Sequence, residues 1–226
     1  MATGLNVFHL EFLLIAALWT LGLSAISLIG GGILGAGMAL CRISPNRAVR
    51  LIASLYIQLI QGTPLLVIIF LGYFGLPAIG FSVPPLAAAS VALSVYVSAY
   101  LGDIWRSALE SVAKAQWEAA ECLALTSTQR MVHVIMPQAV RIATPPTVGF
   151  VVQLIKNTSL VSVVGIVELT RAGQVINNSI FQPFEVYLLI AILYFAMCYP
   201  ISIVSRRLEL RRGFRGNKQA LPLQTS

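Results

Sequence analysis

Long apolar stretches, separated by shorter polar interruptions, run along most of this chain. A helix needs about 20 apolar residues to cross a bilayer. Five segments reach or approach that length: about Glu11–Cys41, Leu51–Leu76, Leu86–Ile104, Thr147–Val167 and Glu185–Ser205. The pattern predicts an all-α membrane protein with about five transmembrane helices.

The composition supports a membrane protein. Hydrophobic residues make up 58% of the chain and charged residues only 10%, whereas a soluble domain carries about 25% charged residues. The first forty residues contain neither Lys nor Arg, so the positive region that opens a signal peptide is missing. We therefore expect the first apolar segment to remain as a membrane helix.

The basic residues predict the direction in which the helices cross. Thirteen of the fifteen Lys and Arg follow the first helix, lie in the polar insert 105–146, or follow the fifth helix, which is one side of a five-helix arrangement. Arg171 lies on the other side, and Lys156 lies inside the fourth predicted helix. Because Lys and Arg gather in cytoplasmic loops, residues 1–10 are predicted to be external.

This arrangement gives a membrane domain over residues 11–208, with the insert and a basic tail at 209–226 in the cytoplasm. The net charge of +7 is then a feature of the side that faces the cytoplasm. The predicted non-protein partner is the lipid bilayer, and no nucleic acid is expected.

The polar insert has the pattern of two helices joined by a turn. Val112–Leu125 is rich in helix formers, and Thr126 with Gln129 matches a capping box that starts a second helix. We expect Pro137 to interrupt that helix and Pro145-Pro146 to break the chain again. The product is a helix–turn–helix elbow fixed at both ends to membrane helices, so a push on the elbow must move them.

Glycines occur where helices should approach closely. Gly31 and Gly35 form a GxxxG step, which lets the backbones of membrane helices come into contact. The contact could lie within one subunit or between two subunits.

The elbow also carries a known motif. The pattern Glu-Ala-Ala, three residues, usually Gly, nine residues, Ile-x-Leu-Pro marks the permease subunits of bacterial ATP-binding-cassette (ABC) importers. This chain supplies Glu118-Ala119-Ala120, Ala124, Val134, Met136 and Pro137. The chain departs from the pattern at three places, with Ala124 for Gly, Val134 for Ile and Met136 for Leu. Ala124 predicts a less sharply kinked turn.

Further segments resemble the polar amino acid branch of that family, which imports histidine, glutamine, glutamate and arginine. They are Gln61–Leu66, Tyr73–Pro77, Gln116–Ala120, Lys156–Leu160 and Glu168–Arg171. Together the resemblance covers roughly Leu10–Arg207, and five helices with an external N-terminus agree with that branch. It places the protein in the bacterial inner membrane, with the type I importer permease fold.

The resemblance implies three kinds of protein partner. They are a second permease, identical or a sister; a cytoplasmic ABC ATPase dimer that receives the elbow; and an external amino-acid-binding protein. The residues implied in ATPase coupling are Glu118, Ala119, Ala120, Ala124, Leu125, Thr126, Ser127, Gln129, Arg130 and Pro137.

The chain contains no GxxxxGK[ST] run, so it has no P-loop of its own. We expect no enzymatic activity and no cofactor in this subunit, with ATP and Mg²⁺ held by the partner ATPase. Three scattered cysteines show no metal-ligand spacing. No metal site is predicted.

Polar residues gather on the fourth predicted helix. A charged group at mid-membrane costs at least about 2.5 kcal/mol, so these residues should face a cavity or a partner helix. Lys156 could receive the carboxylate of an amino acid, could pair with Asp103, or could cap a broken helix. Asn157 stands where the branch often has an acidic residue, which argues mildly against a cationic substrate.

Other pathway candidates lie on the second and third helices. Thr63 precedes Pro64, which marks either a cavity-lining break or an ordinary proline kink, and Tyr100 could be a pathway or a packing residue. The predicted substrate-pathway residues are Thr63, Tyr100, Gln153, Lys156, Asn157, Thr158 and Ser159. Glu168 and Arg171, at the outer end of the fourth helix, could form a gate, a binding-protein contact or a surface pair.

The main prediction is a permease subunit of an ATP-driven amino acid importer. The alternative is an ion-gradient-driven secondary transporter of small polar solutes. It is disfavoured because the predicted helices lack intramembrane acidic pairs and five helices leave no inverted repeat.

Overall fold

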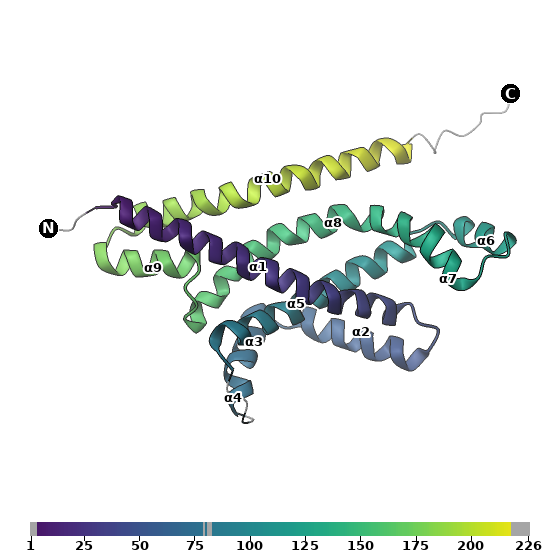
Figure 1. Cartoon of the computed structure of the whole chain (residues 1–226), viewed down its shortest axis with the longest axis horizontal. Helices are drawn as coiled ribbons and strands as arrows, with labels where there is room; N and C mark the ends of the chain where they lie inside the picture. Colours follow the sequence, from purple (N-terminus) through teal and green to yellow (C-terminus); the bar gives the residue numbers. More distant parts are fainter. Residues whose placement is uncertain (1–3, 79, 81–82, 218–226) are drawn as a thin grey trace.

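The computed structural model describes residues 4–78, 80 and 83–217. All the regular elements in these ranges are helices, as predicted (Figure 1). In chain order they are α1 (Val7–Arg42), α2 (Arg47–Gly62), α3 (Leu65–Phe70), η1 (Leu71–Gly75), α4 (Leu76–Ala78), α5 (Pro85–Glu110), α6 (Lys114–Cys122), α7 (Ser127–Gln129), η2 (Arg130–Ile135), α8 (Met136–Asn157), η3 (Thr158–Val164), α9 (Leu169–Ile180) and α10 (Pro183–Asn217).

The number of membrane crossings agrees with the sequence. Among the described residues, four helical segments are long and apolar enough to cross a bilayer: Val7–Arg42, Pro85–Glu110, Ser127–Val164 and Pro183–Leu210. A fifth crossing is possible through α2 together with α3 and η1, which pass the same test as a bent pair. The prediction of an all-α membrane fold with about five crossings is confirmed.

The second predicted helix breaks at Thr63–Pro64, which was one of the two interpretations of that pair. Its two halves meet at an angle of 104°, so the alternative of an ordinary proline kink is wrong. Thr63 and Pro64 both have extended backbone, with ψ of 131° and 134°. A residue before proline is pushed out of the helical region, and here the chain follows that preference well beyond an ordinary kink.

The fourth crossing begins much earlier than Thr147. The helix α8 runs through Pro145 and Pro146 without a break, so the predicted interruption there is wrong. Prolines are tolerated in membrane helices where neighbouring groups satisfy the freed backbone. The Ser205 hydroxyl of α10 donates to the Pro145 carbonyl at 3.2 Å, which ties the two helices together at this point.

Pro137 does not end a helix either. It lies in the first turn of α8, directly after the π-helix η2, and a local π-helical adjustment is one way in which a helix accommodates the missing N–H of a proline. The chain therefore passes from α7 through η2 into α8 without leaving helical geometry. One long arm of the elbow is continuous with a membrane crossing.

The ends of the molecule also differ from the prediction. The helix α1 begins at Val7, capped by Asn6, so part of the expected external segment 1–10 is helical. The helix α10 continues to Asn217, past the predicted end at Ser205 and into the predicted tail. Residues 218–226 of that tail lie outside the described residues.

The GxxxG step packs within one subunit. A Cβ added at Gly31 would lie 2.4 Å from Val97 Cβ and 2.7 Å from the Ser94 carbonyl oxygen, and one at Gly35 would lie 3.1 Å from the Ser98 carbonyl. Both glycines therefore face α5. This contact resolves the two interpretations in favour of close packing inside the chain.

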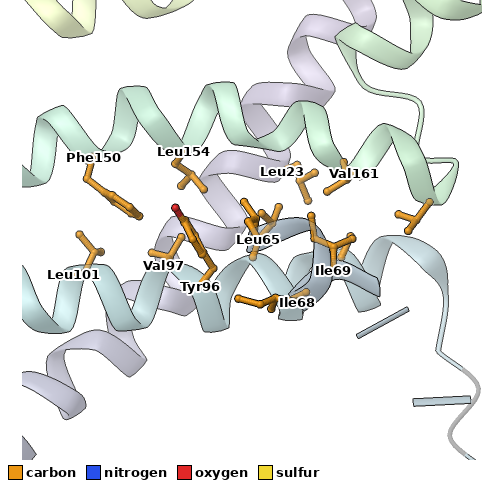
Figure 2. Packing of buried hydrophobic residues seen from close by; sticks show 14 residues of the cluster. Leu23, Leu65, Ile68, Ile69, Tyr96, Val97, Leu101, Phe150, Leu154 and Val161 are labelled. Atoms are coloured by element: carbon orange, nitrogen blue, oxygen red, sulfur yellow. The ribbon is translucent and has the colours of Figure 1, made fainter. Parts of the chain in front are cut away.

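The largest buried cluster joins the broken helix to the long ones. Leu65, Ile68 and Ile69 of α3 lie in one buried cluster with side chains of α5 and η3, and Leu101 and Phe150 stand at the other end of the group (Figure 2). These contacts fix the direction in which the chain leaves the Thr63–Pro64 break.

The two ends of the bundle carry different elements. The α1–α2 connection, the elbow helices α6 and α7, and the end of α10 lie at one end, whereas α9 and the starts of α1 and α10 lie at the other (Figure 1). The first group holds the basic residues of the side that the charge count assigns to the cytoplasm.

Candidate coupling elbow and solute pathway

The elbow consists of two arms, α6 and the α7–η2 segment, joined by the turn Leu123–Thr126. The turn is a Schellman motif: the Leu125 N–H donates to the Ala120 carbonyl at 3.3 Å, and the Ala124 N–H donates to the Glu121 carbonyl at 2.9 Å. This motif needs a left-handed residue after the helix, and Ala124 has φ 53°.

Ala124 therefore adopts the conformation that favours the glycine of the family pattern. The expectation of a less sharply kinked turn is wrong. The turn keeps the shape that glycine would give it, and the alanine Cβ makes this left-handed conformation less favourable because it comes too close to the following carbonyl oxygen.

The capping box that starts the second arm is confirmed. The Gln129 N–H donates to Thr126 Oγ1 at 3.3 Å, and the Thr126 N–H donates to Gln129 Oε1 at 2.9 Å. Both partners lie within one turn of helix. The second arm can therefore begin at Ser127 without help from distant residues.

The Glu-Ala-Ala residues divide between an outer and an inner face. The Glu118 side chain is 59% exposed and pairs only with Lys114, at 3.3 Å, among the described residues. Ala119 is exposed and Ala120 is buried. With the exposed residues Thr126, Ser127 and Gln129, Glu118 and Ala119 form a solvent-facing surface, which we call the docking face.

Arg130 is oriented differently from the rest of the predicted coupling set. Its side chain is 19% exposed and points back onto α6. The guanidinium forms an ion pair with Glu121 and lies 5.6 Å from the centre of the Trp117 ring. Pro137 is exposed in the first turn of α8, and Leu125 is half-buried.

A small apolar cluster fixes the elbow to two membrane helices. Its buried members are Leu109, Val112, Ile135 and Ala139, and its partly buried members include Ile43, Trp117 and Met131. Leu109 belongs to α5 and Ala139 to α8, so displacement of the elbow must displace both helices.

The predicted pathway residues near the end of α8 differ in exposure: two are exposed, and a third bonds a side chain of α5. Gln153 and Lys156 are exposed, and Asn157 donates from Nδ2 to the Tyr96 hydroxyl at 3.3 Å. Tyr100 stacks on Phe150 with ring centroids 5.4 Å apart and also packs on Tyr96 at 4.5 Å. Polar groups and aromatic faces therefore meet between α5 and α8.

The hydroxyl groups of the set bond to their own helices. Thr158, which is fully buried, donates to Ile155; Ser159 donates to Lys156; and Thr63 donates to Leu59, each at 2.7 Å. These donors are already used. In this structure the three hydroxyl groups could therefore take part in binding a solute only as hydrogen-bond acceptors.

Lys156 does not pair with Asp103. Asp103 accepts from Arg106 at 2.9 Å, and within the described part of the chain Lys156 has no ion pair. Lys156 lies in the last turn of α8, where free carbonyls and the helix dipole favour a cation. The interpretations as a helix cap and as a carboxylate site both stay predictions.

Glu168 is a structural residue that the sequence did not predict correctly. Its carboxylate is fully buried and caps α9, accepting from the backbone of Thr170 and Arg171 at 2.9 Å each. It also accepts from the Tyr194 hydroxyl at 2.9 Å. The Arg171 guanidinium donates to Gln174 instead, so the expected surface pair is wrong.

Burial raises the pKa of the Glu168 carboxyl above its usual value, although its hydrogen bonds oppose that change. A sequence signal existed. Gly165 precedes it at φ 88°, and a glycine followed within a few residues by an acidic residue is typical of a helix end and a new N-cap.

A cavity of about 430 Å³ lies on the elbow side of this region, between α1, α5 and α8, with Ala39, Leu109 and Val140 among its lining residues. Its polar atoms are already bonded: Trp105 Nε1 donates to Thr147 at 3.0 Å, and Thr144 donates to the Val140 carbonyl at 2.7 Å. Most of its lining is apolar, so the cavity offers an amino acid few polar partners. Within the described residues, no group of His, Cys, Asp and Glu could hold a metal ion.

Two solved ABC transporters share this fold. The chain superposes with a TM-score of 0.86 and 32% identity on a solved amino acid ABC transporter crystallised with histidines, over 92% of this chain and 100% of that one. The methionine transporter MetNI, at 19% identity and a TM-score of 0.77, shares the fold over 90% of this chain and 97% of its own.

Relatives by sequence agree. The "Probable amino-acid ABC transporter permease protein YckA" of Bacillus subtilis is 38% identical over 84% of both chains. In the same organism, the "L-cystine transport system permease protein TcyB" is 37% identical over 85% of this chain and 83% of its own. A "Probable glutamine ABC transporter permease protein GlnM" of that organism is 36% identical over 85% of this chain and 89% of its own.

The fold and the elbow define a permease of the type I ABC importer class. Residues 31–213 match the family model described as "Binding-protein-dependent transport system inner membrane component", and the chain belongs to that family. It is therefore a multi-pass membrane protein, and family membership sets aside the gradient-driven alternative.

Proposed function

We propose that this chain is the permease subunit of an ATP-driven amino acid importer and passes the solute between α5 and α8. The observation that carries the proposal is the elbow. An exposed face with Glu118 and Ala119, next to a Schellman turn, is joined through one apolar cluster to both helices that flank the aromatic and polar residues. The names of the relatives, which include amino acid, glutamine and cystine systems, support the substrate class.

The elbow transmits the work of the partner ATPase dimer, which holds ATP and Mg²⁺. The ATPase docks on the docking face, and Glu118 offers a carboxylate that needs no partner within this subunit beyond the exposed Lys114. Closure of the ATPase dimer then displaces the elbow. Because α7, η2 and α8 are continuous, the displacement reaches Gln153–Asn157 along a single helical path.

The far end of α8 receives the solute. The ammonium group of Lys156 matches a carboxylate, and the side-chain amides of Gln153 and Asn157 can bond either the carboxylate or the amino group. Tyr96 and Tyr100 supply hydroxyls beside aromatic faces. This arrangement suits the group common to all amino acids, so choice among side chains would fall to other contacts.

The elbow end faces the cytoplasm and the α9 end faces outward, where the amino-acid-binding protein docks. Support comes from the basic residues, thirteen of which belong to the side that carries the elbow. A second permease, identical or a sister, completes the pathway.

The test is purification of the chain in mild detergent from its own membranes, with mass spectrometry of the proteins that accompany it. A P-loop ATPase should be recovered with the wild type and lost or much reduced with Glu118→Gln. Lys114→Gln is the matched control, because it removes the same ion pair and leaves the carboxylate in place.

Uptake into proteoliposomes gives the decisive comparison. The wild type with ATPase should accumulate an amino acid only when ATP is present on the elbow side. Uptake by the permease alone, driven by an ion gradient, would overturn the proposal.

A further inference from the structure

Arg130 makes contacts that the docking face does not explain. It stands at the start of η2, after the turn, and its side chain returns to α6. There it reaches Glu121 by an ion pair and Trp117 by a cation–π contact at 5.6 Å. An arginine whose side chain is 19% exposed presents little surface to a partner protein.

We infer that Arg130 is a positioning residue that locks the two arms of the elbow together, and that it is not a contact with the ATPase. This inference rests on the proposed coupling function. We call the three residues Trp117, Glu121 and Arg130 the elbow clasp.

The clasp crosses the turn where the other bonds are local. The Schellman bonds join α6 to the turn, and the capping box joins Thr126 to Gln129. Farther from the turn, Gln138 donates to Gln116 at 3.2 Å and links α6 to α8. Between these two places, among the described residues, Arg130 supplies a polar side-chain bridge from one arm to the other.

The chemistry of arginine suits this position. Its planar guanidinium can lie over an indole ring and bond a carboxylate at the same time, and it is always charged. Trp117 in turn packs on the apolar cluster that holds the elbow to α5 and α8. The clasp therefore connects the tip of the elbow with its anchor.

The expected consequence concerns force. With the clasp intact, a push on the docking face moves both arms as one body. Without it, the α7–η2 arm can shift relative to α6, and part of the ATPase stroke is absorbed in the elbow before it reaches α8.

The first experiment measures the rigidity of the elbow in the permease without any ATPase. Spin labels are placed at Leu123→Cys, the exposed residue that ends α6, and at Val132→Cys, an exposed residue of η2, after Cys41, Cys122 and Cys198 have been replaced by Ser or Ala. Arg130→Met should broaden the distance distribution between the labels, since it keeps the aliphatic stem and removes the charge.

Three further variants sharpen the result. Glu121→Gln tests the same clasp with Arg130 in place, and it serves if Arg130→Met fails to fold. Arg130→Lys should fall between wild type and Arg130→Met, because it keeps a charge but loses the planar group. Arg141→Met removes an exposed arginine of α8 and should leave the distribution unchanged.

The second experiment measures solute transported per ATP hydrolysed by the assembled importer. The Arg130→Met and Glu121→Gln importers should retain the ATPase on purification and still hydrolyse ATP, but move several-fold less solute per ATP. A distance distribution like that of the wild type in both variants would overturn the clasp. Failure of the wild type to recover an ATPase would instead overturn the proposed function, since the distance measurement does not depend on it.

Discussion

At the scale of single residues, the elbow turn depends on an alanine in a left-handed conformation. Ala124 has φ 53°, which costs an L-residue about 1–2 kcal/mol. We expect Ala124→Gly to raise the free energy of unfolding by up to about 1 kcal/mol, seen as a higher melting temperature in detergent. Ala119→Gly, in the exposed middle of α6, should lower it by a similar amount, and equal effects of the two changes would contradict the argument.

A second residue-scale prediction concerns Glu168. Burial raises the pKa of its carboxyl in the folded protein above 4.5, so the folded state binds the proton more tightly than the unfolded state. Protonation of Glu168 therefore stabilises the folded protein. This stabilisation is complete below pH 4.5, the pKa in the unfolded chain, and is lost as the pH rises through the pKa of the folded protein. The melting temperature should therefore rise as the pH falls from neutral to about 5.

The neutral variant Glu168→Gln isolates this contribution. It keeps an oxygen that can cap α9, and it should show a flatter dependence of melting temperature on pH. A dependence as steep as in the wild type would assign the effect to other groups.

At the scale of elements, the packing of α1 on α5 depends on glycine. A Cβ at Gly31 would meet Val97 and the Ser94 carbonyl at less than 3 Å, so Gly31→Ala should destabilise the protein by about 1–3 kcal/mol. Gly37 lies on the same helix with nothing within 4 Å of such a Cβ. Gly37→Ala should leave the melting temperature unchanged or raise it, and a matching loss for both variants would refute close packing as the cause.

The same scale shows which elements a sequence can predict. The capping box at Thr126 and Gln129 was predictable because both partners lie within four residues of each other. The passage of α8 through Pro145 and Pro146 was not, since it depends on how α8 packs against other helices, such as α10 at Ser205. The angle at Pro64 likewise depends on where α3 finds its packing partners on α5 and η3.

In the site, too, local features were predictable from the sequence and features that depend on distant neighbours were not. The exposed Glu118 and the turn around Ala124 were located by a motif of fixed spacing. The inward orientation of Arg130 and the burial of Glu168 depend on which neighbours the fold supplies, here Trp117 and Tyr194. Spacing alone does not contain that information.

At the scale of the whole molecule, the distribution of charge predicts an orientation. Single cysteines at Arg47 and at Gln174, in a background without Cys41, Cys122 and Cys198, report on opposite ends of the bundle (Figure 1). An impermeant thiol reagent added to intact cells should label Gln174→Cys and spare Arg47→Cys, since Lys and Arg remain in the cytoplasm. Inverted membrane vesicles should give the opposite pattern, and labelling of both sites in intact cells would reject the orientation.

The turn of the elbow is shaped by bonds that begin and end inside the segment 117–130: the Schellman pair, the capping box and the clasp. A segment whose shape depends on bonds within itself can be transferred to another protein. We expect this segment, grafted in place of the corresponding stretch of a related permease, to keep its shape and to bring its choice of ATPase with it. With such hybrid importers, the choice of ATPase could be changed independently of the solute that is transported.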